Sequence, residues 1–207
     1  MSDEDLYQIW LDIWDQLGLA MPVTDVYLDL LHRYQEPQRY YHTLQHIKEC
    51  FAHQDYVQKA AHFPAEVAMA IWYHDAIYDV RAQDNEARSA ELATEVLRDA
   101  GANKAQIERI RQHIMATKTH QSNQANENKD SDILLDIDLL ILAAEPSRFE
   151  EYQQQIRQEY KHVPTLIYRL KRSSILREFL SRDAIYKNHY FADQFEEDAR
   201  RNLMNAK

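Results

Sequence analysis

Apolar residues recur along most of this chain three or four positions apart, which is the spacing of one face of an α-helix. Between residues 4 and 17, for example, Leu6, Ile9, Trp10, Ile13 and Leu17 share one face. Prolines at the starts of such stretches and glycines at their ends set the expected boundaries. We expect helices over residues 4–17, 22–34, 84–100, 103–118 and 131–143, and further helices that begin at about 42 and at 64. Another begins at Pro146 and ends before Pro164, the next runs from there to about 180, and the last runs from about 188 to the end.

The shortage of glycine supports an all-α fold. Gly18 and Gly101 are the only two glycines in 207 residues, too few for a sheet rich in tight turns or for a glycine-rich phosphate loop. Both are expected to end helices, and Asp84 is expected to cap the helix over 84–100. No repeat or change of composition divides the chain. The sequence therefore predicts a single all-α domain, residues 1–207, with about nine to ten helices.

Charge and composition argue against several classes of protein. The net charge is −10, and the only basic cluster is residues 169–172 with Arg177 nearby, which disfavours nucleic-acid binding. The longest apolar runs fall far short of the ~20 residues of a membrane span, and the acidic start is unlike a signal peptide. The single cysteine, Cys50, has apolar neighbours, so we expect a buried thiol and a cytoplasmic protein. A small phosphorylated substrate stays compatible with this charge, and the oligomeric state stays open.

The pair His74–Asp75 interrupts the apolar stretch 70–79 with two potential metal ligands. Neighbouring helical residues point about 100° apart, so both can reach one ion only over the seam between their faces. Burying a carboxylate beside an imidazole is unfavourable without a partner, and a divalent cation is the simplest partner. A lone His–Asp pair is more often a satisfied histidine beside an exposed aspartate. Here two further segments add ligands.

Upstream, His42 and His46 lie four residues apart, which puts them on one face of the expected helix. Downstream, Asp136 and Asp138 lie within the apolar run 134–142. An imidazole, a His–Asp pair and a distant aspartate form a mixed nitrogen and oxygen set. Such a set suits one divalent ion among Mn, Fe, Co, Ni, Zn and Mg.

This order of motifs resembles the HD superfamily of metal-dependent phosphohydrolases. Their flanks resemble in particular the branch of small, stand-alone HD phosphohydrolases, over about Trp10 to Leu203. The matching segments are residues 41–47, 72–79, 85–90, 116–120 and 135–139. The resemblance implies an HD-type helical bundle, with a metal core at about 40–143 and a C-terminal helical part at about 146–205. It also implies hydrolysis of a small phosphomonoester or nucleotide by a metal-activated water.

The resemblance assigns His46, His74, Asp75 and Asp138 as metal ligands. Asp138 is preferred because the family ligand directly precedes an apolar helical run, while Asp136 faces the opposite way. Catalytic roles fall to Asp75 and to Glu86, as a general base or a holder of a histidine ring. Glu86 is explained equally well as a first-turn glutamate favoured by the helix dipole. Groups that could bind substrate are His42, Tyr78, Lys118, His120 and Arg172.

Several alternatives remain open at this level. Tyr78 is better explained by a place at the edge of the core, and Lys118 by a solvated helix end. A di-iron oxygenase on the same fold would need His113 and His120 as added ligands, although His113 lies on what looks like a polar helix face. A nucleotide sensor without turnover and an inert helical interaction module are the others. The polar, Asn-rich segment 120–129 is expected to be a mobile loop, able to cover the site.

Overall fold

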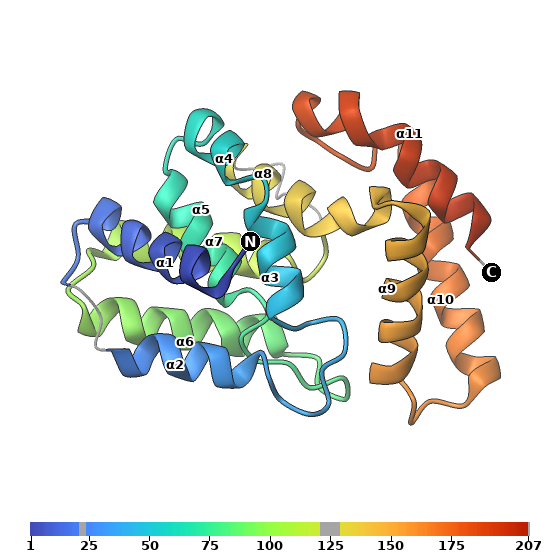
Figure 1. The fold of residues 1–207 in the computed structure, drawn as a ribbon, viewed down its shortest axis with the longest axis horizontal. Coiled ribbons are helices and arrows are strands. Elements are labelled where there is room, and N and C mark those ends of the chain that lie inside the picture. Colours follow the sequence, from blue (N-terminus) through green and yellow to red (C-terminus); the bar gives the residue numbers. More distant parts are fainter. Residues whose placement is uncertain (21–23, 121–128, 207) are drawn as a thin grey trace. The chain divides into compact units, whose positions relative to one another are not determined.

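The computed structural model describes residues 1–20, 24–120 and 129–206. These residues form eleven α-helices and one 3₁₀ helix, and they contain no strand, so the predicted all-α class is confirmed (Figure 1). Contacts divide the chain into two compact units, Met1–Leu134 and Leu135–Lys207, with the boundary inside one helix. The predicted single-domain arrangement stays a prediction.

The first unit contains seven complete helices and the beginning of an eighth. They are α1 (Asp3–Leu17), α2 (Thr24–Arg33), α3 (Leu44–Phe51), α4 (Gln54–Ala60), α5 (Pro64–Tyr73), α6 (Asn85–Asp99), α7 (Lys104–Ala116) and α8 (Lys129–Asp138). Every helix predicted over these residues is present, although Pro22, the expected start of the second, lies outside the described residues. The short helix α4 was not predicted.

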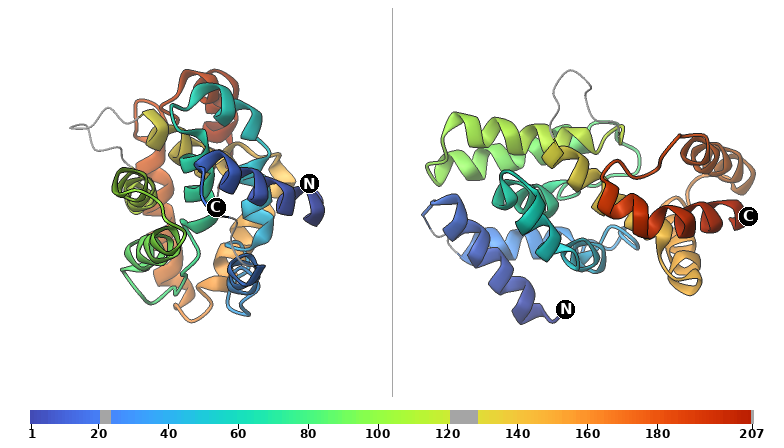
Figure 2. Two further views of the ribbon diagram at one scale, coloured as in Figure 1. Left: turned by 90° about the vertical axis from the view of Figure 1, so that its left-hand side faces the viewer. Right: turned by 90° about the horizontal axis from the view of Figure 1, so that it is seen from above.

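Helix α5 is the centre of the first unit. Pro64 opens it at a position where no backbone N–H is needed, and every residue from Ala65 to Tyr73 is buried. A helix that is buried on all sides needs neighbours on all sides. It packs against α1, α3, α4, α6 and α7, and α6 and α7 also lie side by side (Figure 2). This packing fixes the end of α5, where His74 and Asp75 lie.

The predicted helix ends are confirmed at both glycines. Gly18 and Gly101 have φ angles of 66° and 86°, the left-handed region that glycine enters without a steric penalty. The predicted cap at Asp84 is wrong in one respect. Asp84 occupies the N-cap position of α6, but its backbone is not extended and its side chain makes no capping hydrogen bond.

The second unit continues from α8 through the 3₁₀ helix η1 (Leu139–Ala143), α9 (Pro146–Glu159), α10 (Thr165–Leu180) and α11 (His189–Asn205). The helix predicted over 131–143 therefore changes to 3₁₀ geometry after Asp138. Two side chains attach η1 to the rest of this unit. The Tyr186 hydroxyl donates to the carbonyl of Leu139 at 3.2 Å, and the Asn202 amide donates to the carbonyl of Leu142 at 2.9 Å. Within the described residues, no helix is both long enough and apolar enough to cross a membrane.

Candidate metal centre

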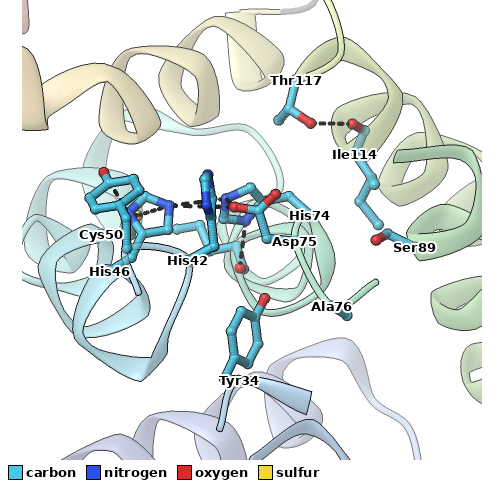
Figure 3. A network of polar contacts seen from close by, with 12 residues as sticks. Tyr34, His42, His46, Cys50, His74, Asp75, Ala76, Ser89, Ile114 and Thr117 are labelled. Carbon is cyan, nitrogen blue, oxygen red and sulfur yellow. Dashed lines mark hydrogen bonds and ion pairs between the residues drawn. The ribbon is translucent and has the colours of Figure 1, made fainter. Parts of the chain in front are cut away.

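Three predicted ligands meet at the end of α5. His46 comes from α3, His74 is the C-cap residue of α5, and Asp75 follows it (Figure 3). The two Nε2 atoms lie 3.2 Å apart, and Oδ2 of Asp75 lies 3.1 Å from Nε2 of His74 and 3.8 Å from Nε2 of His46. Both imidazoles are buried, while the Asp75 side chain is 19% exposed. Among the described residues this is the one group of three such side chains that could hold a metal ion.

Hydrogen bonds to the other ring nitrogens orient both imidazoles. Nδ1 of His74 lies 2.9 Å from the carbonyl oxygen of Ile71. Because a carbonyl only accepts, Nδ1 carries the proton, and neutral His74 presents the lone pair of Nε2 to the cluster. Nδ1 of His46 lies 3.1 Å from the hydroxyl of Tyr41, and the buried thiol of Cys50 lies 3.8 Å from the same ring. Metal-ligating histidines are commonly oriented by such bonds.

The three groups fit a single divalent ion. Metal–nitrogen bonds are about 2.0–2.1 Å long, so nitrogens 3.2 Å apart suit neighbouring positions around one ion. Two imidazole lone pairs and a carboxylate repel one another unless a positive charge lies among them. A proton on Nε2 of His74 is the other way to supply that charge, since it would point at both His46 and Asp75. Two nitrogens and one oxygen suit several divalent metals.

The His–Asp pair lies at the end of a helix and not within one, contrary to the sequence prediction. Helix α5 ends at Tyr73, and Asp75 already belongs to the following turn. His74 keeps helical backbone angles, with φ −56° and ψ −36°. Because Asp75 lies in this turn, its carboxylate can approach Nε2 of His74. An ion bound by both side chains therefore does not have to lie over the seam between two helix faces.

Arg39 holds this turn in place, and the sequence analysis missed it. Its side chain is fully buried and donates to the carbonyls of Asp75 at 2.7 Å, Ala76 at 3.0 Å and His42 at 3.1 Å. Nε pairs with Glu36 at 2.9 Å. Arg39 therefore joins the segment before α3 to the turn after α5. A cation within an aromatic segment, three residues after a glutamate, was the available signal.

His42 does not lie on the helix that carries His46, so the predicted shared helix face is wrong. Thr43 is the N-cap of α3, and its side chain accepts a hydrogen bond from the backbone N–H of Gln45. His42 precedes that cap, and its ring stacks on Tyr78 with centroids 4.1 Å apart. The guanidinium of Arg39 lies 5.4 Å from the centre of the Tyr78 ring. Two predicted substrate-binding residues, His42 and Tyr78, are thus brought together beside the ligands.

Helix α6 fixes the next part of the loop. The Ser89 hydroxyl accepts from the backbone N–H of Ile77 at 3.0 Å, and the Asn85 amide both donates to and accepts from the backbone of Asp79. Glu86 lies in the first turn of α6 and is half-buried; no hydrogen bond within the described chain joins its side chain to the His–Asp cluster. Lys118 is exposed and donates to the carbonyl of Gln83 at 3.1 Å. The catalytic role of Glu86 and the substrate role of Lys118 stay predictions.

The remaining predicted residues lie elsewhere. Asp138 is the last residue of α8 and belongs to the second unit, so its ligand role stays a prediction. Asp136 is buried, and its carboxylate accepts from the backbone N–H groups of Lys187 at 2.9 Å and Asn188 at 2.7 Å. Arg172 also belongs to the second unit, where its Nε and Nη2 both donate to the side-chain oxygen of Gln153.

His113 is buried in α7 and does not lie on a polar face as the sequence suggested. Its Nδ1 lies 2.8 Å from the Ser131 hydroxyl, and burial lowers its pKa from 6.5 to about 4. It is not part of the three-residue cluster found among the described residues. His120 has a positive φ of 48° at the edge of the described chain. The predicted loop beyond it, residues 121–128, lies outside the described residues.

Comparison with known proteins identifies no relative. No family model, curated protein or solved structure matches this chain.

Proposed function

We propose that this protein is a metal-dependent phosphohydrolase of the HD type, acting on a small phosphomonoester or nucleotide. The observation that carries the proposal is the convergence of two imidazole Nε2 atoms and one carboxylate oxygen at the end of α5. The order of the ligand motifs along the chain adds support, because it resembles the HD superfamily.

In this proposal His46, His74 and Asp75 hold one divalent ion, and Asp138 supplies a fourth ligand. When bound, such an ion makes a water molecule more acidic and polarises a phosphoryl oxygen. The Ile71 carbonyl keeps Nδ1 of His74 protonated, so its Nε2 remains available as a ligand. Asp75 is the most exposed of the three clustered groups, so its carboxylate can accept a proton from water at the open side.

The substrate side of the site follows from the neighbouring groups. The stacked rings of His42 and Tyr78 are suited to contact a base or a phosphate. Glu86, Lys118 and His120 complete the set of polar groups that we assign to the substrate. The cytoplasm is the compartment we propose, because Cys50 is a buried single thiol that a reducing environment maintains.

Among the alternatives, a di-iron oxygenase has less support. It would need His113 as an added ligand, and that ring is bonded to Ser131 and apart from the three-residue cluster. A nucleotide sensor would use the same metal ligands without turnover.

A phosphate-release screen over nucleotides and sugar phosphates, with Mn²⁺ or Co²⁺ added, tests the proposal. We expect release by the wild type and by His62→Ala, which changes an exposed histidine of the same unit. His74→Ala should lose roughly a hundredfold or more of the rate, because a ligand to the metal is gone. Equal rates in wild type and His74→Ala would contradict the proposal. If metal is bound but no compound of the panel releases phosphate, the result would favour the nucleotide sensor over the hydrolase.

A further inference from the structure

The second unit contains a cleft of about 670 Å³ between α9, α10 and α11. Four arginines line it: Arg157 from α9, Arg169 and Arg172 from α10, and Arg201 from α11. The one acidic residue in the lining is Glu150. Such a concentration of positive charge is unexpected in a chain whose net charge is −10.

Most of this charge is not neutralised by the protein. Arg201 pairs with Asp198 at 2.6 Å. Arg157 donates to the carbonyls of Tyr160 at 2.7 Å and Val163 at 3.2 Å, which orient the guanidinium but carry no net charge. Arg172 donates to the neutral amide of Gln153. For Arg157, Arg169 and Arg172, no carboxylate partner occurs in the described chain.

The balance of charge in the cleft indicates its ligand. Three guanidinium groups without carboxylate partners, set against the carboxylate of Glu150, leave two positive charges in excess. A phosphate monoester carries close to two negative charges at neutral pH. Guanidinium groups bind phosphate oxygens through paired N–H donors, and they desolvate more readily than ammonium groups.

Two of the arginines are held in place before any ligand arrives. The Arg157 guanidinium lies 4.8 Å from the centre of the Tyr168 ring, and that of Arg172 lies 4.9 Å from the centre of the Tyr152 ring. Aromatic faces favour such cations. Groups fixed in advance lose less conformational entropy on binding. A volume of about 670 Å³ is also within the range of pockets that bind small molecules.

We propose that this cleft binds a small phosphorylated molecule, through residues different from those of the proposed metal centre. Arg172, which the sequence suggested as a phosphate contact, belongs to this second site. The inference does not depend on the proposed hydrolysis, because all of its residues lie in the second unit.

Isothermal titration calorimetry of the full chain tests the proposal, with inorganic phosphate, pyrophosphate and ATP as probes. Each titration is run twice, once with divalent metal and once with EDTA. EDTA removes the metal, so anions that bind through the metal no longer contribute heat. Two variants reduce the positive charge of the cleft. One is Arg169→Gln, which changes an exposed side chain without a carboxylate partner, and the other is the double variant Arg169→Gln/Arg172→Gln. The matched control is Lys171→Gln/Arg177→Gln, which removes two charges from the same helix outside the cleft.

We expect at least one probe to bind the wild type saturably in EDTA. Loss of each guanidinium should weaken binding roughly tenfold or more, while the control should stay within about twofold of the wild type. The proposal is overturned if no probe binds the wild type, or if Arg169→Gln and the double variant bind as tightly as the control. Binding that disappears in His74→Ala would assign the anion to the metal centre and would also overturn it.

Discussion

Most buried charged side chains here have identifiable partners, and these partners decide what each residue can do. Glu66 receives two hydrogen bonds from Arg109, at 2.6 and 2.7 Å. Asp136 is held by backbone N–H groups that follow it by about fifty residues. A carboxylate used in this way contributes to the fold, whereas the Asp75 carboxylate lies against two imidazole nitrogens.

Asp136 and Asp138 are therefore expected to respond differently to substitution. Asp136→Ala removes the acceptor for the N–H groups of Lys187 and Asn188, and should lower the free energy of unfolding by about 1–3 kcal/mol. Asp138→Ala should instead lower the affinity for the metal. Urea unfolding and metal titration of both variants separate the two effects. A loss of metal in Asp136→Ala but not in Asp138→Ala would show that the ligand was assigned to the wrong aspartate.

His113 should make the stability of the protein sensitive to acid. Its pKa is lowered from 6.5 to about 4, first by burial, so the unfolded chain binds a proton that the folded chain does not. Stability from this residue is complete above about pH 6.5 and is lost as the pH falls toward about 4, by a few kcal/mol in total. Urea unfolding across this range should show a weaker pH dependence in His113→Gln than in the wild type. The control His62→Gln, which changes an exposed histidine, should keep the wild-type dependence of stability on pH. The same dependence in His113→Gln would show that His113 is not the source of the acid sensitivity.

At the scale of elements, apolar periodicity predicted the helices because tertiary packing uses the same faces. Pro64 and Gly101 marked a start and an end correctly, since each acts through its own backbone. The short α4 was missed because its seven residues bury only Val57. The place of His42 was missed because Thr43 caps α3 one residue later. Arg39 was missed because the spacing to Glu36 indicates only one of its partners, and the carbonyls of His42, Asp75 and Ala76 that it binds cannot be read from the sequence.

Arg39 gives a test at this scale, because it joins two elements that carry ligands. Arg39→Met should lower the free energy of unfolding by roughly 3 kcal/mol, since the carbonyls of Asp75 and Ala76 lose buried donors. It should also weaken metal binding by loosening the turn. Arg33→Met, which removes a surface ion pair with Asp29, should cost less than about 1 kcal/mol. Equal losses in the two variants would contradict the role of Arg39.

At the scale of the whole molecule, the two units have different chemistry. The first contains the cluster of His46, His74 and Asp75, and the second contains the arginine-lined cleft. The cluster of the first was predictable from the adjacent His74–Asp75 pair and from the resemblance of the motif order, which added His46. The cleft was not predictable, because its arginines come from three helices. The sequence also does not show which of these arginines lack a carboxylate partner.

The central claim is that His46, His74 and Asp75 hold a divalent metal and do not merely share a proton. Inductively coupled plasma mass spectrometry, after loading with Mn²⁺ and dialysis, tests it most directly. We expect about one ion per chain in the wild type and in His62→Ala, and close to none in His74→Ala and Asp75→Ala. Circular dichroism checks that each variant is folded. A wild type that retains no ion after loading with any of the candidate metals, or full occupancy in both ligand variants, would contradict the account.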